Sequence, residues 1–426
     1  MHTTNRWILI AAVALVSSGL GCAGAASSPS RLSDRSTAPA EAAAVLDPRP
    51  ASTDLAVAQV APRRRPAGPP VLLWERPVPF ATGLAAGRDR VFVFSGNDIL
   101  ALDTASRSVA WSYEAPELRP GARVLGCACP AGGSLVREQV YTIAGGDTVM
   151  ALDPATGKVR WSQVVGQAAA SPPVERDGTV VLLAADTDGF FLTGLIAATG
   201  VPRWETRPAA PIFPALVLFQ GLVLAPLGAG GAAAFSLETG QLVWSTTDQM
   251  ARDLFDDAQV GAGVLTLKTN DGIVALDART GSSLWQKKLP EWPVVLTISG
   301  ERVYAGTRSG HLSAFDVRSG EFRWSADLTP GFYSDAVLAT ENTLHVLARG
   351  GRLVALDPAT GQIRWEDRFP AAMGAPTVVD GALSLATLDG TVYVLDPETG
   401  VRRGTATVPG SVVLPPIEGS GGFFVL

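Results

Sequence analysis

Side chains able to do chemistry are scarce in this sequence. Its 426 residues include three histidines and three cysteines, which are His2, His311, His345, Cys22, Cys127 and Cys129. Metal cages and nucleophilic active sites are mostly built from clusters of these residue types. The sequence shows no nucleophile elbow and no histidine pair, so we expect His311 and His345 to be structural. The composition therefore favours a protein without a catalytic or metal-binding site.

Two of the cysteines lie one residue apart, in the long segment 117–135. The spacing Cys127-Ala128-Cys129 permits a strained disulfide in an oxidising compartment, and two unpaired thiols are the alternative. A two-cysteine metal site would need further ligands nearby, and the sequence offers none. We expect a structural disulfide between Cys127 and Cys129.

A glycine-rich stretch at 228–233 matches the G-x-G-x-x-A pattern of dinucleotide-binding loops. That pattern binds phosphate only when a helix follows and presents its backbone N–H groups. Here Ala234-Phe235-Ser236 continues as a strand pattern. We therefore expect a turn between two strands.

The N-terminus is typical of an exported protein. Arg6 precedes an apolar stretch at 7–16, which is too short to span a bilayer, and small residues follow. Gly19-Leu20-Gly21-Cys22 resembles a lipoprotein cleavage site and makes Cys22 the expected lipidation site, although Gly19 stands where leucine is usual. Cleavage after Ala25, which would discard Cys22, is the alternative. Residues 1–22 are thus the expected signal peptide.

Residues 23–70 are rich in Ala, Pro and Ser, and we expect them to form a disordered tether. The formal net charge of the chain is −6, and acidic residues outnumber basic ones in 71–426. A mildly acidic body argues against nucleic acid as a partner.

An eleven-residue pattern returns throughout the body. One copy reads A-L-D-P-A-T-G-K-V-R-W at 151–161, and an eighth copy has Gly404 in place of the tryptophan. The other seven copies end at Trp111, Trp161, Trp204, Trp244, Trp285, Trp324 and Trp365. The mean spacing of about 42 residues is the length of one four-stranded propeller blade.

Each position of the pattern has a physical role. The aspartate accepts hydrogen bonds from backbone N–H groups ahead of it, and the glycine supplies the positive φ that returns the chain. The tryptophan lies on the outer strand, where its ring can pack between neighbouring blades. We therefore expect an all-β fold: a single eight-bladed propeller of four-stranded antiparallel blades over 71–426, with the seven tryptophans as blade-docking residues.

These units resemble the tryptophan-docking repeats of proteins related to pyrroloquinoline-quinone (PQQ) enzymes. In layout the chain is most similar to the family of the outer-membrane protein assembly factor BamB. That resemblance implies a non-catalytic scaffold on the periplasmic face of the outer membrane, held by a lipid anchor and monomeric within a complex. Its protein partners would include the β-barrel assembly machinery. A soluble periplasmic or secreted protein is the alternative location.

The resemblance also suggests a second function, that of a quinone- or ligand-binding propeller with a dehydrogenase or sensory role. Family members that use PQQ are longer, with a Ca²⁺ site, an aspartate base and often a disulfide of adjacent cysteines. The cysteines here are not adjacent, so we expect no PQQ and no metal.

Two features remain open in the sequence. The repeats depart from the pattern at Ile196 and Ser236, which replace aspartate, and the terminal strands slightly overfill eight blades. The segment 248–257 after Trp244 mixes acidic and apolar residues and is the expected partner-binding loop; a solvated loop is the alternative. Its expected contact residues are Arg252, Asp253, Asp256 and Asp257.

Overall fold

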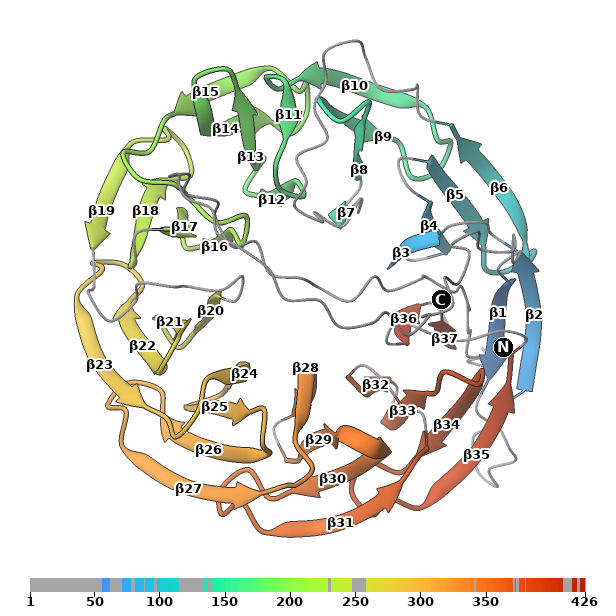
Figure 1. Ribbon diagram of the computed structural model, residues 1–426. Coiled ribbons are helices and arrows are strands. Elements are labelled where there is room, and N and C mark those ends of the chain that lie inside the picture. Colours follow the sequence, from blue (N-terminus) through green and yellow to red (C-terminus); the bar gives the residue numbers. More distant parts are fainter. Residues whose placement is uncertain are drawn as a thin grey trace, which may run out of the picture.

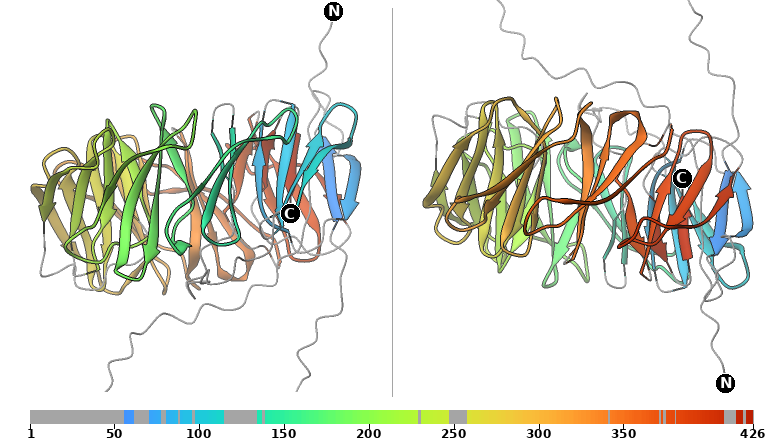
Figure 2. Two further views of the ribbon diagram at one scale, coloured as in Figure 1. Left: turned by 90° about the horizontal axis from the view of Figure 1, so that it is seen from above. Right: turned by 90° about the horizontal axis from the view of Figure 1, so that it is seen from below.

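The computed structural model describes residues 56–61, 71–77, 81–87, 89–95, 98–114, 134–136, 139–228, 231–246, 258–340, 342–370, 372, 375–379, 381–408, 416–419 and 422–425. These residues form a ring of antiparallel sheets around a central axis (Figure 1). Seen from the side, the ring is a flat disc with the strands running roughly across its thickness (Figure 2).

The first four repeat blades use consecutive strands, which follow one another from the axis outward. Blade 1 is β3 (Ala81–Ala86), β4 (Arg90–Ser95), β5 (Asp98–Asp103) and β6 (Ser108–Tyr113). Blade 2 is β7 (Ser134–Val136), β8 (Gln139–Ala144), β9 (Thr148–Leu152) and β10 (Val159–Val164). Blade 3 has its inner strand in two pieces and is β11 (Ala168–Ala169), β12 (Val174–Arg176), β13 (Thr179–Asp186), β14 (Gly189–Ile196) and β15 (Pro202–Thr206). Blade 4 is β16 (Val217–Phe219), β17 (Leu222–Pro226), β18 (Ala232–Ser236) and β19 (Leu242–Thr246).

The other four repeat blades follow in the same order. Blade 5 is β20 (Ala258–Gly261), β21 (Val264–Thr269), β22 (Gly272–Asp277) and β23 (Ser283–Lys288). Blade 6 is β24 (Pro293–Ser299), β25 (Arg302–Thr307), β26 (His311–Asp316) and β27 (Phe322–Asp327). Blade 7 is β28 (Phe332–Ala339), β29 (Leu344–Ala348), β30 (Arg352–Leu356) and β31 (Ile363–Arg368), with a 3₁₀ turn, η2 (Arg349–Gly351), between β29 and β30. Blade 8 is β32 (Thr377–Val379), β33 (Ala382–Ala386), β34 (Thr391–Leu395) and β35 (Arg402–Thr407).

The hydrophobic core lies between neighbouring blades. The second and third strands of a blade are buried on both faces, so they consist of nearly continuous apolar residues, as in β9. The outer strands are mostly exposed, and in β10 Trp161 is the one fully buried residue. One core cluster, for example, joins Leu224 and Trp244 of blade 4 to Leu265 and Val274 of blade 5. The expected all-β propeller with eight four-stranded repeat blades is confirmed.

A ninth sheet in the described part of the chain settles how the ring closes. Its order from the axis outward is β36 (Ile417–Gly419), β37 (Gly422–Val425), β1 (Ala56–Ala61) and β2 (Val71–Pro77). It lies between blades 1 and 8, and both ends of the chain contribute to it (Figure 1). None of the terminal strands that overfilled eight blades is displaced, because they form this additional sheet together.

The expected tether at 23–70 extends too far toward the body. Ala56–Ala61 is a strand, with Gln59 opposite Trp74 of β2 on one side and Phe424 of β37 on the other. This alanine-rich segment has little strand propensity of its own. Backbone pairing on both sides stabilises it instead, and composition alone gives no sign of such pairing. The rest of 23–70 and the expected signal peptide lie outside the described residues.

Candidate partner-binding face

The two faces of the disc are formed by different sets of turns. Because the strands of each blade are antiparallel, every turn between a third strand and an outer strand lies on one side, which we call the turn face. The connections from an outer strand to the next blade's inner strand lie on the opposite side, which we call the connection face. The turns between second and third strands lie on the connection face as well.

The motif aspartates build the turn face. Asp153 Oδ1 accepts hydrogen bonds from the backbone N–H groups of Ala155 and Thr156, both at 2.9 Å, and from the Thr156 hydroxyl at 3.0 Å. The Gly157 N–H donates to the Asp153 carbonyl at 2.8 Å, and Gly157 has a φ of 69°. A hydrogen bond from Arg160, followed by those of the turn, lowers the pKa of Asp153 to about 2.

The tryptophans lock each blade to the turn of the next. The Trp161 ring packs on Gly200, where a Cβ would lie 2.4 Å from the ring, and its Nε1–H donates to the Ala197 carbonyl at 2.7 Å. Six of the seven predicted docking tryptophans donate this hydrogen bond to the following blade: Trp111, Trp161, Trp204, Trp285, Trp324 and Trp365. Trp244 packs on Gly281 in the same way, but its buried Nε1 has no hydrogen-bond partner among the described residues. The motif glycine therefore has a second role, because any side chain there would displace a tryptophan.

A further repeated residue was not predicted from the sequence. In all eight repeat blades a β-bulge leaves the residue before the tryptophan position without a cross-strand partner, and we call this the bulge position. In four blades an arginine there pairs with the motif aspartate at 2.6 to 2.8 Å: Arg160–Asp153, Arg323–Asp316, Arg364–Asp357 and Arg403–Asp396. The recurring Arg-Trp dipeptide was the available signal.

Blade 3 shows what remains when the aspartate is lost. Ile196 replaces the aspartate, and Arg203 at the bulge position donates to the Thr179 hydroxyl at 3.2 Å. In the other three repeat blades the bulge residue is uncharged, being Ala110, Val243 or Leu284.

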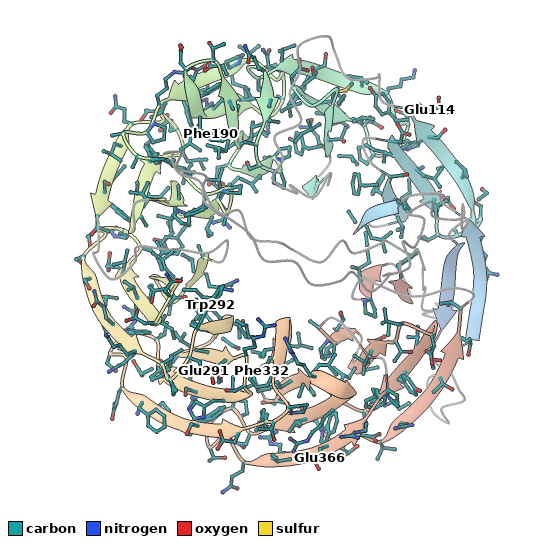
Figure 3. All side chains as sticks on the ribbon, viewed as in Figure 1. Glu114, Phe190, Glu291, Trp292, Phe332 and Glu366 are labelled. Atoms are coloured by element: carbon teal, nitrogen blue, oxygen red, sulfur yellow. The ribbon has the colours of Figure 1, made fainter. Side chains whose placement is uncertain are left out.

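The connection face around blades 5 and 6 is the candidate surface for a protein partner. The predicted partner loop, with Arg252, Asp253, Asp256 and Asp257, lies outside the described residues. Trp292 precedes β24, the inner strand next to β20, and is 46% exposed. Figure 3 shows Glu291 and Trp292 toward the inner side of the ring, whereas Glu366 lies on the outer rim.

Polar and charged side chains of blades 5 and 6 lie on the same face as Trp292. Glu291 Oε2 accepts a hydrogen bond from the Ser309 N–H at 3.2 Å. His311 Nδ1 lies 2.8 Å from Asp327 Oδ1, and Lys288 Nζ lies 3.3 Å from Asp271 Oδ2. Tryptophan is enriched among the residues that contribute most to binding at interfaces. Trp292 falls outside the 42-residue spacing of the docking tryptophans, and that departure could have singled it out.

The three cysteines and His345 are the other residues that the sequence singled out. Cys22, Cys127 and Cys129 lie outside the described residues. His345 is buried in β29, and its ring centroid lies 5.8 Å from that of Trp365. Within the described residues, no group of three or more His, Cys, Asp or Glu side chains is placed to hold a metal ion. No helix of this part of the chain has the length and hydrophobicity needed to cross a membrane.

Fold and surface together define a tryptophan-docked β-propeller with an exposed aromatic and charged face, a class that includes both enzymes and binding proteins. The family model described as outer membrane protein assembly factor BamB matches residues 128–262, 258–331 and 308–407. The chain belongs to this family.

Individual relatives agree with that assignment. The chain is 26% identical over 301 residues to BamB of Burkholderia pseudomallei, covering 65% of this chain and 76% of that one. It is 27% identical over 285 residues to BamB of Yersinia pestis, covering 60% and 68% of the two chains. Among solved structures, BamB from Moraxella catarrhalis has a TM-score of 0.50 at 17% identity, covering 67% of this chain and 90% of that one. The structural likeness supports the propeller fold.

Proposed function

We propose that this protein is a non-catalytic scaffold in outer-membrane protein assembly, which binds a protein partner through the connection face of its propeller. Membership of the BamB family, with matches over residues 128–407, carries this proposal. The named relatives are outer membrane protein assembly factors. The partner would be a component of the β-barrel assembly machinery, and the propeller would act as a monomer within that complex, without PQQ.

The connection face supplies the means of binding. Trp292 offers a large rigid apolar surface, and Glu291, Asp271 and Asp327 lie on the same face of the disc. Aromatic residues contribute most to affinity at interfaces, while charged groups at the rim govern association rate and specificity. A partner for this surface would present an apolar pocket with basic residues around it.

The anchor would join the ring on the same face. Ala56, the first residue of β1, lies opposite Pro77 at the end of β2, and β2 ends at the connection face. We propose that Cys22 carries a lipid and holds the protein at the periplasmic face of the outer membrane. The connection face would then be the side nearer the membrane, where a membrane-embedded partner is accessible.

Affinity purification from native membranes tests the function. The wild type should co-purify with β-barrel assembly components, and Trp292→Ala should lose most of them while unfolding at an unchanged temperature. Val401→Ser is the matched control, because Val401 is an exposed apolar residue on the turn face. Full recovery of the partners with Trp292→Ala would remove Trp292 from the interface. Cofactor-dependent turnover by the purified protein would overturn the scaffold function itself.

A further inference from the structure

The outer strands of the ring are exposed sheet edges. Each of them, β19 and β23 included, ends its sheet and pairs with one other strand among the described residues. An exposed edge presents unpaired backbone N–H and C=O groups, which can pair with a strand from another chain. Proteins commonly protect such edges with bulges and with charged side chains.

Most repeat blades carry both protections. The bulge twists the strand just before the tryptophan position, and in five blades an arginine stands at the bulge: Arg160, Arg203, Arg323, Arg364 and Arg403. A strand approaching one of these edges would have to displace or bury a guanidinium group. The charge at the bulge position therefore acts as a guard on the edge.

Three blades lack this guard: blade 1, where the bulge residue is Ala110, and the neighbouring blades 4 and 5. The bulge residue is Val243 in β19 and Leu284 in β23, and these side chains are 52% and 41% exposed. Leu242, beside Val243, is 58% exposed. The strands follow one another along the rim (Figure 1), and the Trp244 ring of β19 packs on Gly281, two residues before β23.

Blade 4 lacks the acidic half of the pair as well. Ser236 stands in place of the motif aspartate, so neither charge of the usual pair is present there. In blade 5 the aspartate remains. Asp277 Oδ1 accepts hydrogen bonds from the backbone N–H groups of Arg279, at 3.0 Å, and Thr280, at 2.9 Å. Among the described repeat blades, a large exposed apolar side chain at the bulge position is thus confined to two adjacent edges, whereas blade 1 has only the small Ala110 there.

We propose that β19 and β23 form a strand-acceptor edge, which binds an extended, uncharged and apolar segment of another polypeptide by strand addition. Edge chemistry identifies this occupant: backbone groups recognise a strand, and uncharged apolar bulge residues accept apolar side chains. A charged segment would meet no opposite charge at either bulge position. This surface lies on the outer rim, apart from Trp292, and its assignment does not depend on the proposed function.

Restoring the guard tests the proposal without disturbing the fold. Leu284→Arg places an arginine opposite Asp277, as Arg323 stands opposite Asp316, and Ser236→Asp/Val243→Arg rebuilds the pair in blade 4. Ala110→Arg is the control, because it makes the same change in blade 1, where Asp103 accepts hydrogen bonds from its own turn. Thermal unfolding should show that all three variants remain folded.

The probe is a fluorescein-labelled peptide of alternating valine and threonine, roughly ten residues long, like a long strand. Fluorescence anisotropy should show binding to the wild type and to Ala110→Arg. Binding to each guard-restored variant should be weaker by about tenfold, because the partner must then desolvate a charge. A version with proline at every second position should not bind, since proline cannot donate to a strand ladder.

Several results would overturn the proposal. The first is that the wild type does not bind the peptide, and the second is that Ala110→Arg weakens binding as much as the guard-restored variants do. The third is that the proline peptide binds as well as the original peptide, which would indicate general apolar adhesion. Sedimentation of the wild type provides the last test. A dimer that dissociates on Leu284→Arg would assign the edge to a second copy of this chain and overturn the assignment to another polypeptide.

Discussion

The contact between Gly361 and Trp324 provides a direct test of how the blades are held together. Gly361 has a φ of 71°, and a Cβ on it would lie 2.4 Å from the Trp324 ring of the preceding blade. Alanine there faces two separate penalties. The left-handed backbone conformation costs about 1 kcal/mol, and displacing a packed ring costs about 1–3 kcal/mol more.

Gly178 separates these two penalties. Its φ is 75°, and a Cβ on it would meet nothing within 4 Å. Gly178→Ala should therefore lower the free energy of unfolding by about 1 kcal/mol, through the backbone alone. Gly361→Ala should lower it by about 2–4 kcal/mol.

A double-mutant cycle isolates the contact itself. Trp324→Ala removes a buried ring and its 3.0 Å hydrogen bond to the Pro358 carbonyl, at a cost of about 3–5 kcal/mol. In that background Gly361→Ala no longer meets a ring, and its effect should shrink to about 1 kcal/mol. Urea denaturation followed by tryptophan fluorescence and by circular dichroism measures all four proteins. Equal effects of Gly361→Ala in both backgrounds would refute the docking role of the glycine.

Two further predictions concern acid stability and anchoring. His345 is buried, and its Nε2–H donates to the Pro397 carbonyl at 2.9 Å, whereas its Nδ1 has no hydrogen-bond partner within the described part of the chain. Burial lowers the pKa of His345 below its usual value, although the hydrogen bond to Pro397 and the charge of Glu398 oppose this shift. The unfolded chain therefore binds a proton at His345 more readily than the folded chain does, so the free energy of unfolding should fall as the pH drops below about 6.5. In His345→Phe the melting temperature should decrease less over the same pH range. Phenylalanine is the suitable replacement because Phe92 packs on Trp111 in the same way. If the melting temperature of His345→Phe depends on pH as in the wild type, His345 does not cause the loss of stability in acid. Cys22→Ser should move the protein from the membrane to the soluble fraction on cell fractionation, because the lipid is the proposed anchor; unchanged membrane association would contradict lipidation.

The arginine at the bulge position shows how far local patterns reach. The Arg-Trp dipeptide was visible in the sequence, yet its pairing with an aspartate seven residues earlier depends on the turn and bulge that bring Arg160 back to Asp153. The same geometry shows that Val243 and Leu284 stand where other blades have this arginine. The absence of an arginine from a repeat can be interpreted only when the place of that arginine in the structure is known.

The sequence by itself determined the repeat blades, their strand order and the position of each turn. Those features follow from interactions within about a dozen residues, such as the hydrogen bonds of Asp153 to its own turn. Hydrophobic patterning placed the second and third strands in the core for the same local reason.

Only the tertiary structure decided how the ring closes and which surfaces remain open. The pairing of Gln59 with Phe424 joins the two ends of the chain, and an alanine-rich segment gives no local sign of such a long-range partner. Trp292 and Leu284 are of residue types usually found in the core, and they are exposed because of where the ring places them. Both features depend on contacts between segments distant in sequence, which no local pattern specifies.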